Sequence, residues 1–442
     1  MRIGIQSGTR QMISKGAGMN SLVNNAGSLD TGFAKAGIFT LQLEGYSETL
    51  ILGGQIDPAS QAIYFTGQAR NGVSDRSWFI GCLTPDGNLN PDFGTRGITL
   101  GKFGNLSESK GLSIAFLSQG KILLIGETLT SLALARLHPD GSLDTSYGEQ
   151  GLLIIGNPAA TNDNVAASAP SQQHSGQSIA TAQADGRIVV AHTYQERGNA
   201  GGAYLFMLKS DGTLDLSFNH RGHVKVEHPD HQSAAVNLLS GLMDEDGNAV
   251  ACGLLTTGTS SAALFVRYTR EGYPDPAFGD RGFVINNGTG QYSRLVDLTL
   301  QGNKRMLGCG RVADRSYSGL LISLERDGKF NIQFNQAKPL LTRLGNNDTQ
   351  WSGARQQSDG KIVVVGGMKP ASASVLVLAR FQSNGHIDPT FANGVGWVAT
   401  PVGSGSFNSR GVILQGDGKI VAFGYSTPSE DVAGSVLRYF AK

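Results

Sequence analysis

The sequence predicts an all-β protein: a seven-bladed β-propeller with four antiparallel strands per blade. Three observations support this fold class. A short motif recurs seven times, four β-rich runs accompany each copy, and the two ends of the chain carry complementary parts of one repeat. Repeats of this length with several strands each are typical of propeller blades. We expect a single ring over residues 21–442 and a poorly ordered extension over residues 1–20.

The recurring motif has the pattern Asp-Gly-x-Leu-Asp-x-x-Phe. Its aromatic residues are spaced by 60, 54, 71, 60, 56 and 57 positions, at Phe33, Phe93, Tyr147, Phe218, Phe278, Phe334 and Phe391. The Asp-Gly pair favours a tight turn because Gly adopts positive φ, and the second Asp can accept hydrogen bonds from its own downstream backbone. We expect the aromatic ring to pack between repeats.

Four β-rich runs in each repeat are expected as strands. In the second copy they are residues 97–100, 111–117, 121–126 and 132–137. Grouping strands in this order predicts blades at about residues 37–83, 97–138, 151–209, 222–268, 282–325, 338–381 and 395–440. A linear array would leave two open sheet edges, so a closed ring is favoured.

The ends of the chain support closure. The chain stops just after the last expected strand, residues 435–440, where the next motif would begin. The first motif, residues 26–33, has no preceding strands of its own. It is therefore predicted to fill the joint between the last and first blades.

The motif continues as Phe-Gly-x-x-Gly, and a later Asp-Gly-Lys-Ile leads into a valine-rich strand. This pattern resembles the bacterial delta-60 repeat over nearly the whole chain, from about Gly27 to Tyr439. The resemblance implies a propeller fold and, loosely, surface or interaction roles. It implies no activity, no catalytic residues and no cofactor.

Composition excludes some partner classes. With 36 basic and 35 acidic side chains the formal charge is +1, so no long-range field attracts nucleic acid or a membrane surface. The three cysteines form no Cys-x-x-Cys pair, which argues against a disulfide framework or a zinc site. Residues 1–20 contain no apolar run typical of a signal peptide, which favours the cytoplasm and leaves the compartment open.

Strand parity places the motifs on one face and the loops of variable length on the other. The longest variable loop is residues 156–178. Variable loops are where binding residues concentrate, although they are also polar by default. The candidate binding residues in these loops are Asn162, Asp163, Asn164, His174, Arg197, Arg311 and Arg315.

One set of side chains is a candidate metal site: His228, Asp230 and His231. Imidazole and carboxylate suit zinc, but an ordinary exposed loop is the alternative. The acidic run around Gly247 is expected to be a turn, because no acid stands where a calcium loop needs one.

Aromatic side chains offer a second kind of site. Tyr194, Tyr204 and Trp351 could stack on a sugar, with core packing as the alternative.

A propeller enzyme with an axial metal would place polar residues near the start of several first strands. Only His223 and Lys225 stand out there. No nucleophile elbow, phosphate-binding loop or HExxH motif is present.

The sequence therefore favours a non-enzymatic propeller that binds a protein, peptide or glycan through its variable loops. A propeller hydrolase or lyase with an axial metal, and a purely structural repeat module, remain as alternatives.

Overall fold

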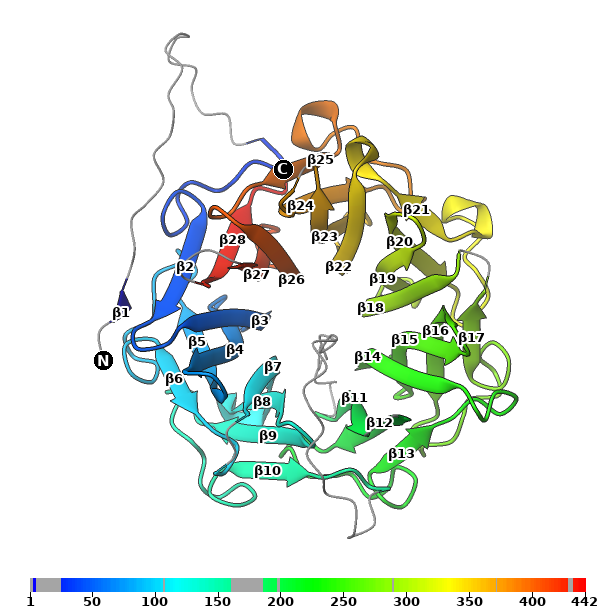
Figure 1. Cartoon of the computed structure of the whole chain (residues 1–442), viewed down its shortest axis with the longest axis horizontal. Coiled ribbons are helices and arrows are strands. Elements are labelled where there is room, and N and C mark those ends of the chain that lie inside the picture. The colour runs from blue at the N-terminus through cyan, green and yellow to red at the C-terminus, as the bar shows by residue number, and fades with distance from the viewer. Residues whose placement is uncertain are drawn as a thin grey trace.

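The computed structural model describes residues 3–4, 25–105, 108–159, 186–196, 199–287, 290–370, 372–427 and 432–442. Antiparallel sheets stand around a central axis and form a ring (Figure 1). Each helical segment in the described part of the chain is a three-residue 3-10 turn, at η1 (Ser118–Gly120), η2 (Asn335–Ala337), η3 (Leu344–Asn346) and η4 (Ala392–Gly394). None of these turns is long and apolar enough to cross a membrane.

Four-stranded sheets recur along the chain. The first consists of β3 (Glu48–Ile56), β4 (Ile63–Asn71), β5 (Asp75–Leu83) and β6 (Ile98–Gly101). The second consists of β7 (Lys110–Phe116), β8 (Ile122–Glu127), β9 (Leu132–Leu137) and β10 (Leu152–Ile155). The third has three strands within the described residues, β11 (Ile188–Glu196), β12 (Asn199–Leu208) and β13 (His223–Val226).

The next two groups are joined by one parallel bridge, between Ser261 and Tyr292. The first of them consists of β14 (Ala235–Met243), β15 (Ala249–Thr257), β16 (Ser260–Tyr268) and β17 (Phe283–Asn286). The second consists of β18 (Tyr292–Leu300), β19 (Met306–Ala313), β20 (Tyr317–Leu324) and β21 (Leu340–Thr342).

Two sheets complete the ring. One consists of β22 (Asp348–Gln356), β23 (Ile362–Lys369), β24 (Val375–Phe381) and β25 (Trp397–Thr400). The other consists of β26 (Ser406–Leu414), β27 (Ile420–Thr427), β28 (Gly434–Tyr439), β2 (Ile38–Leu43) and β1 (Ile3–Gly4). In each sheet, the strand named first above lies nearest the central axis (Figure 1).

Strand pairing corrects the blade boundaries expected from the sequence. The run at residues 97–100 was expected to open a blade, but it forms the outermost strand β6 of the sheet before it. The motif causes this, because its turn returns the chain along the strand it has just left: Cys82 N–H donates to the Gly97 carbonyl at 3.0 Å. Each expected blade is therefore wrong by one strand. In the six repeats where the second run lies within the described residues, that run forms the first strand of its sheet, as β3, β7, β14, β18, β22 and β26.

The joint between the chain ends matches the expectation. The strands β2 and β28 pair, so the N-terminal segment completes the sheet that the C-terminal strands begin (Figure 1). Asp30 N–H donates to the Arg438 carbonyl at 2.8 Å. Phe33 lies in one core cluster with Ile51 of the first sheet and Val421 of the last. The prediction that residues 26–33 fill this joint is confirmed, whereas residues 1–2 and 5–24 lie outside the described residues.

The motif also bonds each repeat to the next. All seven motif aromatics are buried, as expected for packing between repeats. In six copies the residue after the aromatic donates its N–H to the first carbonyl of the following motif. The pairs are Ala34 to Asp86, Gly94 to Asp140, Asn219 to Glu271, Gly279 to Asp327, Asn335 to Asn384 and Ala392 to Ala26. The last pair joins the two ends of the repeat array.

An arginine supports four of the motifs, and the sequence analysis did not identify it; it is buried in three copies and partly buried at Arg136. It stands on the strand before the motif and pairs with the motif's second Asp. The pairs are Arg136 with Asp144, Arg267 with Asp275, Arg380 with Asp388, and Arg438 with Asp30. Each guanidinium also lies over the motif aromatic, at 4.5 to 4.7 Å from the ring centroid.

Two copies replace the ion pair with a neutral pair. Asn331 Nδ2 donates to Ser323 Oγ at 3.1 Å, and Asn90 Nδ2 lies 3.8 Å from the sulfur of Cys82. In these two copies the acid is absent together with the arginine, whereas the fourth copy has Met207 at the arginine position and keeps Asp215, whose Oδ1 accepts the Ser217 N–H at 3.1 Å. The motif Asp therefore has a structural role on this face.

Candidate functional site

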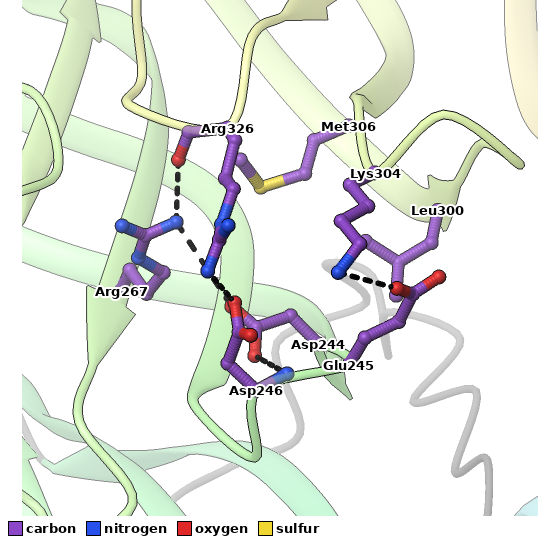
Figure 2. A pocket seen from close by; sticks show the side chains of 8 residues that line it. All are labelled: Asp244, Glu245, Asp246, Arg267, Leu300, Lys304, Met306 and Arg326. Atoms are coloured by element: carbon purple, nitrogen blue, oxygen red, sulfur yellow. Dashed lines mark hydrogen bonds and ion pairs between the residues drawn. The ribbon is translucent and has the colours of Figure 1, made fainter.

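A small pocket opens on the motif face, between the hairpin turns that follow β14 and β18 (Figure 2). Its lining residues are Asp244, Glu245, Asp246, Arg267, Leu300, Lys304, Met306 and Arg326. Asp244 Oδ1 accepts the N–H groups of Asp246 at 3.0 Å and Asn248 at 2.9 Å. This is an Asx-turn, as expected, and it points the carboxylate into its own backbone.

The charges that line this pocket neutralise one another. Asp246 pairs with Arg326, and Glu245 pairs with Lys304 at 3.0 Å. Arg267 is held by Asp275 at 2.7 Å. Figure 2 shows Asp246 directed toward Arg326 and Glu245 directed toward Lys304. The charged side chains of this pocket therefore pair with one another and hold two neighbouring repeats together.

The opposite face carries a different arrangement, which we call the arginine cluster: Arg294, Arg311 and Arg410. Arg294 on β18 stands directly opposite Arg311 on β19 in the antiparallel register. Opposite residues in neighbouring strands share a face of the sheet. Arg311 donates to Gln350 Oε1 on β22 at 2.7 Å, so this face is directed toward the next sheet of the ring.

The bulge in β18 determines this pairing. The register shifts between Leu295 and Asp297, so Val296 is the extra residue. Gly310 lies opposite Leu295, and a Cβ at Gly310 would stand 2.0 Å from the carbonyl oxygen of Arg294. A glycine is required there, and it holds the backbone of Arg294 against β19.

Electrostatic repulsion within the cluster is visible in the pKa values. Burial, then the charges of Arg311 and Arg410, lower the pKa of Arg294 to about 10. Burial also lowers the pKa of Arg311. Both groups stay protonated at neutral pH, so the folded chain holds repelling positive charges partly removed from water.

Arg294 has neither an ion pair nor a hydrogen bond within the described residues, and its Nε is fully buried without a partner. Asp348 on β22 does not neutralise it. The Asp348 carboxylate accepts the Tyr317 N–H at 3.2 Å and pairs with Arg343 at 3.5 Å. Arg294 therefore presents a donor-only group with no acceptor from the described chain.

Eight shielded arginines of the described chain have carboxylate partners. Those partners hold them within 2.8 Å or in a still closer pair: Arg70 with Glu48, Arg76 with Glu108, Arg136 with Asp144, Arg267 with Asp275, Arg305 with Glu325, Arg355 with Asp297, Arg380 with Asp388, and Arg438 with Asp30. Arg294 and Arg311 have no carboxylate partner in the described chain, and they stand side by side.

Comparison with known proteins agrees with the ring of sheets. The family model described as "Domain of unknown function (DUF5122) beta-propeller" matches residues 118–147, 183–218 and 357–391. No curated protein sequence matches the chain. The fold is a β-propeller.

Solved structures are similar at the level of the fold. YCF48 from Cyanidioschyzon merolae is 11% identical with a TM-score of 0.46, over 90% of this chain and 98% of that one. The polysaccharide lyase Uly1 is 9% identical with a TM-score of 0.48, over 95% and 98%. Chaetomium thermophilum Sqt1, bound to the N-terminus of ribosomal protein L10, is 12% identical with a TM-score of 0.41, over 90% and 98%. At these identities the similarity concerns the propeller alone.

The structure places the predicted loop residues as follows. Arg311 belongs to the arginine cluster, and Arg315 is exposed in the turn between β19 and β20. The remaining predicted residues, Asn162, Asp163, Asn164, His174 and Arg197, lie outside the described residues.

The three donors of the predicted metal site do not converge. His228 is buried, and its Nδ1 accepts the Asp230 N–H at 3.2 Å. The Asp230 carboxylate pairs with Arg281. The His228 ring packs against Phe283 and His231, at centroid distances of 4.8 and 4.7 Å. Within the described residues no group of three metal-binding side chains is gathered.

The predicted sugar-stacking aromatics are core residues. Tyr194, Tyr204 and Trp351 are 2%, 3% and 2% exposed. His223 and Lys225 lie on β13, an outer strand, so the sequence analysis examined the wrong strands for axial polar residues. The innermost strands β18 and β26 instead carry Arg294 and Arg410.

Proposed function

We propose that this chain is a seven-bladed, non-enzymatic binding propeller, and that the arginine cluster binds an anionic group of its partner. The single observation that carries the proposal is Arg294, a shielded guanidinium opposite Arg311 without a carboxylate partner in the described chain.

Charge energetics support this role. Like charges directly opposite each other in a sheet destabilise it, and desolvation of a charge adds to the cost. An anion between the two guanidiniums would reverse both effects and accept several charge-assisted hydrogen bonds. The repulsion and desolvation of these arginines in the free protein are then offset when the anion binds.

Position also supports it. The guanidiniums stand on paired strands, which hold a site more rigidly than loops do. They lie on the face of the variable loops, away from the motif turns. The partner is a molecule with an exposed anionic group, within the predicted classes of protein, peptide and glycan.

Sulfate is a suitable probe, since it is an oxyanion with acceptors only. We expect sodium sulfate to raise the melting temperature of the wild-type protein above that in sodium chloride of equal ionic strength, by about 2 °C near saturation. Sulfate also stabilises proteins by exclusion from their surfaces, and this part is common to all variants. The site-specific part should disappear in Arg294→Gln.

The matched control is Arg315→Gln, which removes an exposed guanidinium from the same face. It should keep the full sulfate response. Equal responses in the wild type, Arg294→Gln and Arg315→Gln would overturn the proposed anion site.

A further inference from the structure

The arginine cluster holds positive charge that the described chain does not balance. Arg294 and Arg311 stand opposite each other, and neither has a carboxylate partner among the described residues. Both side chains are partly exposed, so a small ion can reach them from solvent. Burial, then the charges of Arg311 and Arg410, lower the pKa of Arg294, so Arg410 on β26 adds to the same field. A bound anion therefore meets at least two guanidinium charges.

Carboxylates are scarce on the strands around the cluster. Strands β18, β19, β20, β22 and β26 carry two in all, Asp297 and Asp348. Asp297 pairs with Arg355 at 2.7 Å, and Asp348 pairs with Arg343 at 3.5 Å. The exposed turn at residues 314–315 adds one acid and one base. The positive charge of the cluster therefore remains for a ligand.

Neutral contacts hold Arg311 in position. Its guanidinium lies 4.5 Å from the centroid of the Tyr317 ring, and it donates to Gln350 Oε1 at 2.7 Å. Neither the tyrosine ring nor the amide carries a charge, so these contacts fix the guanidinium without neutralising it. A cation held in this way loses little conformational entropy when an anion binds. Its remaining N–H groups can donate to that anion.

Building on the proposed function, we infer that the anionic group is a phosphomonoester dianion, bound by the guanidiniums of Arg294 and Arg311. A phosphomonoester carries up to two negative charges near neutral pH and has three terminal oxygens. Two charges match the two guanidiniums, and three acceptors can receive hydrogen bonds from both. Clusters of arginine are a common means of recognising this group.

Groups with a single negative charge fit the cluster less well. A carboxylate or a sulfate ester would leave one partly desolvated guanidinium uncompensated, and that charge keeps its cost. The same argument disfavours the phosphodiesters of nucleic acid, a partner class that composition also excludes. The number of charges on the ligand is therefore the property that the cluster selects.

Isothermal titration with four ligands that share a phenyl group tests this inference. Phenyl phosphate carries two charges at pH 7.5, whereas methyl phenyl phosphate, phenyl sulfate and benzoate carry one. At constant ionic strength, we expect phenyl phosphate to bind at least about tenfold more tightly than each of the others. Equal affinities would overturn the inference.

The pH dependence of binding provides a second measurement. A phosphomonoester takes up its second proton near pH 6, whereas sulfate keeps both charges and the two arginines stay protonated. The ratio of phenyl phosphate affinity to sulfate affinity should therefore fall about five- to tenfold between pH 7.5 and pH 5.0. Any titration of the protein itself affects both ligands and cancels in this ratio. An unchanged ratio would contradict binding of the dianion.

Variants of Arg294 separate charge from shape. Arg294→Gln leaves one guanidinium in the pair, so phenyl phosphate should bind at least about tenfold more weakly. Arg294→Lys restores the second charge and should keep the preference for phenyl phosphate over phenyl sulfate. The exposed control Arg315→Gln should bind like the wild type, and melting temperatures verify that each variant folds. Wild-type binding by Arg294→Gln would show that the pair does not hold the phosphate.

The same group can come from a protein or from a sugar. A phosphoserine peptide and glucose 6-phosphate present it in these two forms, and the form that binds more tightly identifies the source.

Two results would overturn the phosphomonoester inference while the anion site stands: monoanions that bind as tightly as phenyl phosphate, or an affinity ratio that does not change with pH, each with the Arg294-dependent sulfate response intact. Loss of that sulfate response from the wild type would overturn the proposed function itself.

Discussion

Arginine side chains of this protein occur in two electrostatic settings. In the motif joints, Arg136, Arg267, Arg380 and Arg438 each pair with an Asp and cover an aromatic ring. In the arginine cluster, Arg294 and Arg311 repel each other. The same residue type therefore stabilises one face and is costly on the other, and only the costly setting indicates a ligand.

The motif ion pair can be tested by removing first its acid and then its arginine. Asp388→Asn leaves Arg380 buried with its charge uncompensated, so we expect the free energy of unfolding to fall by about 3 kcal/mol. Adding Arg380→Met, the residue type that Met207 provides at the equivalent place, should recover at least 1 kcal/mol, about a third of that loss. Urea denaturation measures both, with exposed Asp327→Asn as control. A double variant no more stable than Asp388→Asn would contradict this explanation.

Arg294 should respond in the opposite direction. Its lowered pKa means that folding disfavours the charged form, so Arg294→Gln should raise the free energy of unfolding in low salt without sulfate, by about 1 kcal/mol. Arg267→Gln should lower it, because Asp275 would lose its partner. If Arg294→Gln destabilised the protein as much as Arg267→Gln, the guanidinium would have a structural role.

At the scale of the strand, the bulge is the feature that positions the site. Equivalent bulges occur in β3, β7, β14, β18, β22 and β26. A glycine on the neighbouring strand accompanies each bulge, and a Cβ there would lie 1.7 to 2.2 Å from a carbonyl oxygen of the inner strand. The bulge and its glycine recur in these six sheets, and the copy in β18 places two arginines opposite each other.

Gly310→Ala tests this geometry. The added methyl group must displace the Arg294 backbone, so we expect a loss of about 2 kcal/mol in unfolding free energy and a weaker sulfate response. Gly302→Ala, in the turn of the same hairpin, has 4.0 Å of clearance and should change neither. Sulfate titrations followed by melting temperature report both quantities. A full sulfate response in a destabilised Gly310→Ala protein would separate the bulge from the site.

The arginine cluster was only partly predictable from the sequence, because the bulge in β18 determines which residues stand opposite each other. Arg311 was predicted from its place in a variable loop, but Arg294 lies in an apolar strand. Their pairing follows only when Val296 is counted as an extra residue. A hairpin register counted outward from the turn near Gly302 without the bulge pairs Arg294 with Val312, which places the two arginines on opposite faces of the sheet.

At the scale of the whole molecule, the repeat motif allowed prediction of the ring, the buried aromatics and the joint between the chain ends. Those features depend on local turn chemistry, which a few residues determine. The blade boundaries were wrong because an outer strand can pair with either neighbouring sheet. The pairing of β6 with β5 shows which sheet that strand joins, and the hydrogen bond from Cys82 to Gly97 begins it.

The motif carboxylates should make the ring sensitive to acid. The Lys121 and Ser146 hydrogen bonds lower the pKa of Asp144 well below its ordinary value of 3.8. Burial by itself would raise the pKa of Asp388, but hydrogen bonds from Thr390 and the charge of Arg380 lower it. The unfolded chain therefore binds protons first as the pH falls below about 4, and stability declines there.

Urea midpoints at pH 7, 4 and 3 should show little change above pH 4 and a clear loss below it. The decline should be shallower in the variant that combines Arg380→Met with Asp388→Asn, since it lacks one of these carboxylates. A stability that stays constant down to pH 3 would show that the motif ion pairs contribute little.

The most direct test of the account is where an anion binds on the ring. Hydrogen–deuterium exchange with and without sulfate, at equal ionic strength, resolves this along the chain. We expect protection in β18, β19 and the first half of β22, which carry Arg294, Arg311 and Gln350. No change is expected in the motif turns at residues 211–218, 271–278 and 327–334. Protection confined to those turns, or none anywhere, would contradict the claim that the arginine cluster is the binding site.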